Sequence, residues 1–253
     1  MLLRALRPLE GMEEMARRAN VELVNFEASG SRRIKFGSYT FYVAKPVLEA
    51  DVIINLPKLK THSLTLLTCA VKNMFGVMPG FRKGEQHKLY PTPNEFAKML
   101  LHLYKLVTPS LSIVDAGLAM EGNGPSSGNP KWLGLLMAGE DGVAIDAAAA
   151  RLIGFPEGFV DTTRIASEMN LGEARVEELR LVGDAALARA EGFLLPSNRV
   201  RKLIPGPLVR LLAPLVTVKP LIDPETCTGC GFSAESCPAK TIKKAGAASR
   251  TAH

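Results

Sequence analysis

Three basic side chains lie close together near the middle of the first half of the chain. Lys58, Lys60 and His62 fall in a polar turn between an apolar stretch, residues 52–54, and a pattern with helical spacing, residues 64–76. The first stretch predicts a β-strand and the second an α-helix. Free N–H groups at the start of a helix favour an anion, and three basic side chains add to that preference. We therefore expect an anion site at this turn, with a solvated basic loop as the alternative.

A second set of reactive side chains lies near the C-terminus. Cys227, Cys230 and Cys237 are spaced like the cysteines of a bacterial ferredoxin run, C-x2-C-x2-C-x3-C-P, except that Ser233 replaces the third cysteine. These four residues are the candidate ligands of a 4Fe-4S cluster with an incomplete thiolate set. Two alternatives stay open: a segment that has lost its cluster, and a zinc site. Cys69 stands apart from them among apolar neighbours and is expected to be a buried free thiol.

Carboxylates follow the predicted strand at residues 111–115. Asp115 ends that strand, and Glu121 lies in the glycine-rich loop that comes next. Acids at the carboxyl end of a strand would face the same rim as the basic turn. They could act as acid and base, hold a metal, or cap the turn. Asp146 is expected to cap a helix, and a ligand role at the rim is its alternative.

The motifs of this chain resemble those of the domain-of-unknown-function 362 family, whose members are often described as uncharacterised iron–sulfur-centre proteins. The likeness rests on N-x-P-K-x-K-T-H at 55–62, K-N-x-F-G at 72–76 and His87, and it continues through the acidic positions to the cysteine segment. It implies binding roles for Thr61, Lys72, Asn73 and His87. The resemblance supplies no reaction, so whether the protein is an enzyme stays open. The expected ligand-binding residues are therefore Lys58, Lys60, Thr61, His62, Lys72, Asn73, His87, Asp115 and Glu121.

The order of predicted elements indicates the α/β class, with a mostly parallel sheet and helices on both faces. Helices are expected at 11–20, 46–50, 64–74, 92–107, 143–153, 162–170 and 185–190. Strands are expected at 21–24, 39–44, 52–54, 111–115, 132–138 and 179–182, with turns or loops at 30–35 and 76–88. The first domain covers 1–195, and comparison with the family suggests that it is short at its N-terminus. An apolar, proline-rich arm (196–221) and a ferredoxin-like segment with a basic tail (222–253) follow.

Charge is distributed unevenly along the 253 residues. The net charge is +6, and residues 199–253 carry nine basic and three acidic side chains, which accounts for the whole excess. Such a tail suits an acidic redox partner or an anionic surface, or is simply solvated; nucleic acid is not expected as a partner. No apolar run is long enough to span a bilayer and no signal peptide is evident, so we expect a cytoplasmic protein.

Together these features predict an uncharacterised iron–sulfur-associated protein linked to redox chemistry or electron transfer. It would bind an anionic small molecule or partner at the strand-end loops. The alternative is a non-redox anion-binding domain, or a decayed paralogue, whose cluster is gone.

Overall fold

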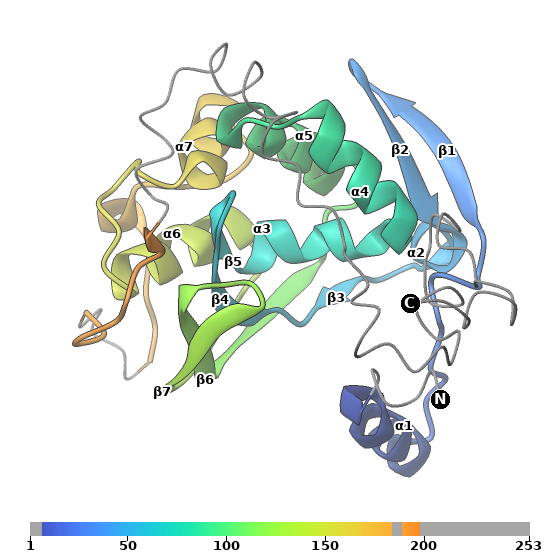
Figure 1. Ribbon diagram of the computed structural model, residues 1–253, viewed down its shortest axis with the longest axis horizontal. Coiled ribbons are helices and arrows are strands. Elements are labelled where there is room, and N and C mark those ends of the chain that lie inside the picture. The colour runs from blue at the N-terminus through green and yellow to red at the C-terminus, as the bar shows by residue number, and fades with distance from the viewer. Residues whose placement is uncertain (1–6, 184–188, 198–253) are drawn as a thin grey trace, which may run out of the picture.

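The computed structural model describes residues 7–183 and 189–197. The cysteine segment, the basic tail and nearly all of the proline-rich arm lie outside these residues, as does most of the helix expected at 185–190. The first described element is α1 (Arg7–Ala19), which agrees with the predicted helix, but residues 21–25 form no strand. In Figure 1, α1 stands apart from the rest of the fold.

The central sheet is built around β6 (Leu111–Asn123). The strands β3 (Ile54–Asn55) and β4 (Lys58–His62) pair with it in parallel, while β7 (Ser127–Gly139) pairs with it antiparallel. A fifth strand, β5 (Leu66–Thr68), runs antiparallel to β4. The predicted α/β class and parallel core are confirmed, and antiparallel strands complete the sheet on both sides.

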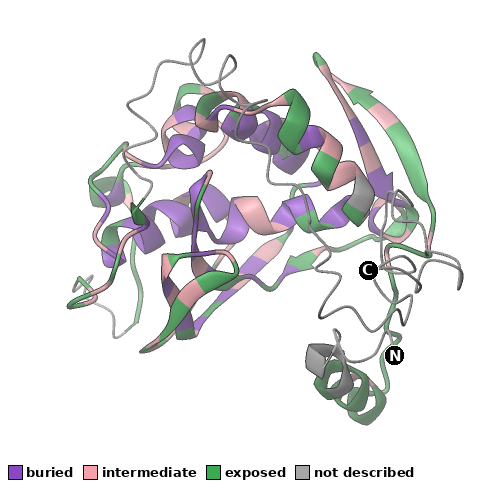
Figure 2. Cartoon of the chain, viewed as in Figure 1, coloured by how far each residue is buried: buried purple, intermediate pink, exposed green. Residues whose placement is uncertain are grey.

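Helices form two layers over the inner face of this sheet (Figure 1). The first layer contains α3 (Ala70–Asn73) and α6 (Gly142–Leu152), which contact each other as well as β6 and β7 respectively. The second contains α5 (Pro93–Leu106) and α7 (Asp161–Glu168), which pack together. The buried residues gather on the helices of both layers and on the sheet (Figure 2), and their side chains form two core clusters. Over β7 the outer face is open among the described residues, because its side chains alternate between exposed and half-buried.

A separate hairpin covers part of α5. Its strands are β1 (Ser31–Phe36) and β2 (Tyr39–Ala44), and α2 (Lys45–Glu49) follows directly. The predicted strand at 39–44 and helix at 46–50 are confirmed. The turn expected at 30–35 is instead β1, whose residues are mostly exposed, so the apolar alternation that marks a half-buried strand is weak there.

The stretch from residue 58 to residue 90 differs most from expectation. Lys58–His62 is a strand rather than a loop, and a turn at Ser63 leads into β5, so no helix begins at Ser63. The predicted helix is reduced to α3, followed by the short 3-10 helix η2 (Met74–Val77). Residues expected to form a loop contain α4 (Gly80–Leu89). Because no helix starts at Ser63, helix N–H groups cannot contribute to an anion site there.

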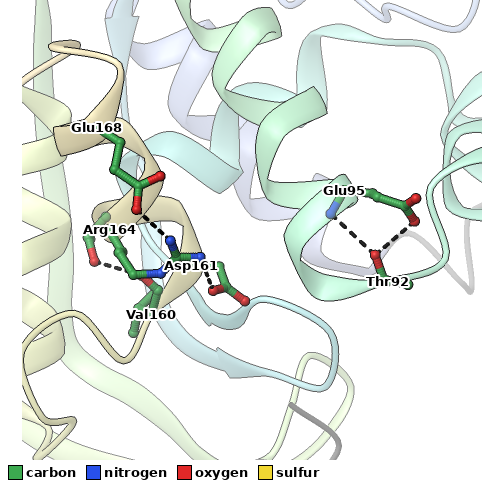
Figure 3. Close-up of polar contacts among 7 residues, drawn as sticks. Thr92, Glu95, Val160, Asp161, Arg164 and Glu168 are labelled. Atoms are coloured by element: carbon green, nitrogen blue, oxygen red, sulfur yellow. Dashed lines mark hydrogen bonds and ion pairs between the residues drawn. The ribbon is translucent and has the colours of Figure 1, made fainter. Parts of the chain in front are cut away.

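Two helix starts agree with the sequence. The hydroxyl of Thr92 accepts a hydrogen bond from the Glu95 N–H (3.3 Å) and donates one to the Glu95 carboxylate (2.8 Å), so Thr92 caps α5 and its side chain is held by that of Glu95 (Figure 3). Asp141 caps α6 through the N–H groups of residues 143 and 144. The helix expected at 162–170 is α7, where Arg164 forms ion pairs with Asp161 and Glu168 (Figure 3).

The hairpin of β6 and β7 is longer than predicted. The glycine-rich loop after Asp115 is in fact strand, and Asp115 lies inside β6. The strand expected at 132–138 is confirmed within β7, but it is not buried on both faces: Trp132 and Leu136 are 74% and 75% exposed. Residues 179–182 form no strand; the 3-10 helix η3 (Val176–Glu178) precedes them.

Candidate functional site

Basic side chains from three elements converge at one place. Lys60 and His62 come from β4, Lys72 from α3, and Lys83 and His87 from α4. Each lies near enough to another of the group to repel its positive charge. We call this group the basic cluster. Four of its five members were predicted as ligand-binding residues. Lys83 was missed because it belongs to none of the motifs, whereas His87 on the same helix does.

His62 is held in one protonation state by its neighbours. Its Nδ1 accepts hydrogen bonds from the backbone N–H groups of Leu64 (3.0 Å) and Thr65 (3.3 Å). Burial, and then the charges of Lys72, His87 and Lys60, lower the pKa of His62 to about 3. The ring is therefore neutral near pH 7, with its single proton on Nε2, because Nδ1 acts as an acceptor. His62 Nε2 therefore provides an N–H donor inside the cluster.

Lys72 lies against an aromatic wall. Its Nζ is 4.6 Å from the ring centroid of Phe75 and 5.6 Å from that of Phe96. Burial, and then the charges of Lys60 and Lys83, lower the pKa of Lys72 to about 8. The ring faces act in the opposite direction, since a cation over an aromatic face is favoured. At pH 7 the ammonium form therefore predominates, but it is costly enough that a nearby anion would stabilise it.

His87 extends this wall toward solvent. Its ring stacks on Phe96 with a centroid distance of 4.4 Å and an interplanar angle of 17°, and it meets Phe75 edge-on at 5.7 Å. Burial against these rings, and then Lys72, lower the pKa of His87. The residue as a whole is exposed, so water screens part of this shift. We place His87 at the mouth of the cluster and His62 at its base, where only 7% of His62 is exposed.

The basic cluster has no acidic partner in the described part of the chain. The ion pairs among residues 7–183 and 189–197 involve neither Lys60, Lys72 nor Lys83. Buried or half-buried charges normally find a counter-charge, because leaving one unpaired is costly. A set of basic groups with cationic and N–H donors but no carboxylate is therefore suited to hold an anion.

A network of amides fixes the helix that carries Lys72. Asn73 donates from Nδ2 to Oδ1 of Asn55 (2.7 Å), and Asn55 donates to the Ala70 carbonyl (2.9 Å) and the Ser112 hydroxyl (3.2 Å). Asn73 was predicted to bind ligand, and the structure shows its amide tied to Asn55. The motif asparagines therefore position α3 against the sheet.

Asp146 also holds α3 in place. Its carboxylate accepts hydrogen bonds from the N–H groups of Ala70 (2.6 Å) and Val71 (3.2 Å). Asp146 is 1% exposed, and burial raises its pKa to about 7. It caps α3, whereas the sequence predicts a cap at the start of its own helix. The adjacent Cys69 thiol is fully buried, and burial followed by the charge of Asp146 raises its pKa well above the ordinary value.

Lys58 and Asp115 do not join the basic cluster. Their Nζ and Oδ2 atoms form an ion pair of 2.7 Å on the outer face of the sheet, with side chains 48% and 52% exposed. The hydrogen bond from Lys58, and then the Gly117 N–H, lower the pKa of Asp115. Both residues were predicted to bind ligand, and both are already paired with each other.

Thr61 and Glu121 hold neighbouring segments together. The Thr61 hydroxyl accepts from the Gly124 N–H (3.2 Å), and a Cβ at position 124 would lie 2.2 Å from the Thr61 carbonyl oxygen, so only glycine fits. Glu121 is buried and accepts from the Leu194 N–H (2.9 Å). Their observed contacts are with the protein itself.

No group of three or more metal-ligating side chains occurs among residues 7–183 and 189–197. The candidate cluster ligands Cys227, Cys230, Cys237 and Ser233 lie outside those residues. Cys69 does not fit as a fourth ligand, because its sulfur is enclosed in the core beside Asp146. Two hollows of about 230 and 470 Å³ lie against α6, and neither touches the basic cluster.

The fold and the site thus define an α/β domain with a partly buried basic cluster. Residues 6–151 match the sequence profile of domain of unknown function DUF362, and the chain belongs to this family. It is also 37% identical over 136 residues to the thylakoid-associated protein sll1697 of Synechocystis sp.. That match covers 53% of this chain and 42% of the relative. No solved structure matches the chain. Within the described residues, every helix is too short or too polar to cross a membrane.

Proposed function

We propose that the protein binds a small anionic ligand at the basic cluster. The observation that carries this proposal is the convergence of Lys60, His62, Lys72, Lys83 and His87 without an acidic partner in the described chain. A bound phosphate, sulfate or carboxylate would accept hydrogen bonds from His62 Nε2 and the lysine ammonium groups. It would also relieve their mutual repulsion.

Titration calorimetry with sulfate and inorganic phosphate, in a buffer free of both, tests the proposal. Lys72→Met keeps the apolar stem against Phe75 but removes the charge, and it should weaken binding by at least about tenfold, equivalent to about 1.4 kcal/mol. Lys58→Met is the matched control, because Lys58 is paired with Asp115 on the outer face, and its affinity should stay within about twofold of the parent. Equal binding by the parent and Lys72→Met, or no heat from either anion, would overturn the proposal.

We further propose that the ligand site works with a redox centre in the C-terminal segment. The support is the ferredoxin-like spacing of Cys227, Cys230 and Cys237. With Ser233 in the third position, three thiolates and one hydroxyl would hold the cluster. The cluster would supply one-electron transfer, and the anion site would hold the molecule or partner that exchanges the electron.

Substitution at position 233 tests this redox role. Ser233→Cys restores the full spacing and should raise iron and acid-labile sulfide per chain after anaerobic reconstitution. The parent measured alongside is the control. Near-zero iron in both proteins would favour the second candidate, a non-redox anion-binding domain or decayed paralogue. That candidate is supported by the basic cluster itself. All members of the cluster lie among the described residues, and none depends on Cys227, Cys230 or Cys237.

The cellular setting stays a prediction. The relative from Synechocystis is named for its association with thylakoids, so association with a membrane surface is an alternative to the cytoplasmic location that we expect. The partner is expected to be an anionic small molecule or an acidic redox protein.

A further inference from the structure

An apolar strip runs along the outer face of the β6–β7 hairpin. Leu118 on β6 lies directly opposite Trp132 on β7, next to a shift in the register of the two strands. Leu133 and Leu135 pack against the core, whereas Trp132 and Leu136 are exposed, so Trp132 and Leu136 share the outer face. The exposed fractions of Leu118, Trp132 and Leu136 are 46%, 74% and 75%. Figure 2 shows the exposed bands along this hairpin. The pair of Lys58 and Asp115 borders the strip, since Asp115 lies opposite Leu136.

The strip continues into a hollow at the edge of the sheet. This hollow, of about 470 Å³, lies between β7, α6 and residues 179–182. Leu136 belongs to both features, and Ile145, Leu152, Leu181 and Val182 line the rest. Exposed apolar side chains that gather in this way mark a place where another apolar segment packs.

The described chain ends at the tip of the β6–β7 hairpin. The Gly122 N–H donates to the Leu194 carbonyl (2.7 Å), and the N–H and hydroxyl of Ser197 both donate to Oδ1 of Asn123 (3.0 and 2.8 Å). Asn123 is the last residue of β6, so Ser197 is anchored at the tip of the hairpin. The segment that follows Ser197 is therefore attached at this tip.

The sequence that follows has the composition to cover the strip. Residues 203–218, LIPGPLVRLLAPLVTV, contain one charged side chain, Arg210. Residues 198–202 can span at most about 17 Å, which matches the roughly 17 Å between Asn123 and Leu118 along β6. Prolines at 205, 207 and 214 lack the N–H groups that a ladder needs, so contact would be made through apolar side chains.

We propose that residues 203–218 pack on the outer face of the β6–β7 hairpin and cover Leu118, Trp132 and Leu136. The segment is tethered at Ser197, which gives it an effective concentration that a separate partner would have to exceed. Two apolar surfaces, one on the sheet and one on the arm, are removed from water by the same contact. The competing occupants are a second copy of the chain and a lipid surface.

The protein contains a reporter for this contact, because Trp132 is its single tryptophan. In the full-length chain, acrylamide should quench Trp132 fluorescence several-fold less than it quenches N-acetyltryptophanamide, at any protein concentration and without lipid. Leu211→Asp should restore quenching close to that of the free compound, since a buried carboxylate opposes packing. Thr241→Asp adds the same charge beyond the apolar segment and should leave quenching unchanged.

Circular dichroism of each variant separates loss of packing from loss of fold. If Leu211→Asp unfolds the chain, Leu208→Asp and Leu215→Asp repeat the test at other positions. The quenching of the parent protein tests the proposal without any variant. Free quenching of Trp132 in the parent overturns the proposal. Protection that grows with protein concentration, which indicates a second copy, also overturns it. So does protection that needs phosphatidylcholine–phosphatidylglycerol vesicles, which indicates a membrane surface.

Discussion

Lys58 and Lys72 belong to neighbouring motifs, yet the fold gives them opposite surroundings. Lys58 lies on the outer face of the sheet, about half exposed, in a 2.7 Å ion pair with Asp115. Lys72 lies inside, against Phe75 and Phe96, with other basic groups as its charged neighbours. A paired lysine in water has little to gain from a further anion, whereas an unpaired, half-buried one has much to gain. The difference shows that burial and partners, rather than the local density of lysines, decide which basic residues form a site.

The largest expected effect is on the stability of the fold, when His62 in the interior of the basic cluster becomes protonated. The pKa of His62 is about 3 in the folded protein and near 6.5 when unfolded, so the unfolded chain takes up the proton first as pH falls. His62 therefore supports stability above pH 6.5, and this support is lost progressively toward pH 3. Protonation would also break the two hydrogen bonds that Nδ1 accepts.

The matching measurement is urea unfolding of the parent and of His62→Asn at pH 7 and pH 4. Asparagine can accept the same N–H groups but does not titrate. The parent should lose up to about 3 kcal/mol more stability than the variant between these pH values. Asp146 acts with the opposite sign: its raised pKa favours folding at low pH, and this contribution is lost as pH rises toward 7. Because Asp146 is present in both proteins, its contribution cancels. Parallel losses in the two proteins would contradict the assignment.

A smaller effect, on the affinity for sulfate, is expected when Lys72 loses its proton. Its pKa is about 8, so sulfate should bind most tightly below pH 8. Above that value the dissociation constant should rise up to about tenfold per pH unit, because the ammonium form must be restored for binding. Sulfate is the suitable probe since it does not titrate in this range.

Calorimetry in two buffers of different ionisation enthalpy should then detect proton uptake on sulfate binding near pH 8 to 9. Lys72→Met should abolish both the proton uptake and the steep pH dependence. A sulfate affinity that is flat from pH 7 to pH 10 in the parent would show that another group supplies the charge.

Helices with strong local signals were predictable from sequence. Thr92 and Glu95 mark the start of α5, and Asp141 marks the start of α6, because capping depends on residues close together in the chain. Most of the basic cluster was also predictable, since Lys60, His62, Lys72 and His87 are all motif residues.

The tertiary contacts around those residues were not predictable from the sequence. Leu64, Leu67, Val71 and Met74 have helical spacing, but tertiary contacts favour the β4–β5 hairpin, where His62 accepts N–H groups from the turn. The partner of Lys58 is set by the register of two strands that are distant in sequence. Similarly, Asp146 caps a helix far away in the chain. Contacts of this kind depend on the assembled sheet and leave no local pattern.

The smallest effect should come from breaking the pair on the outer face. Exposed ion pairs contribute between about 0 and 1 kcal/mol, because water and salt screen them and ordering two side chains is unfavourable. A double-mutant cycle of Lys58→Met and Asp115→Asn, followed by thermal and urea unfolding, should therefore give a coupling below about 1 kcal/mol that disappears in 1 M NaCl. Both single variants should bind sulfate like the parent. A coupling above about 2 kcal/mol that persists in salt would mean that Lys58 is enclosed as Lys72 is, and the contrast between the two lysines would no longer hold.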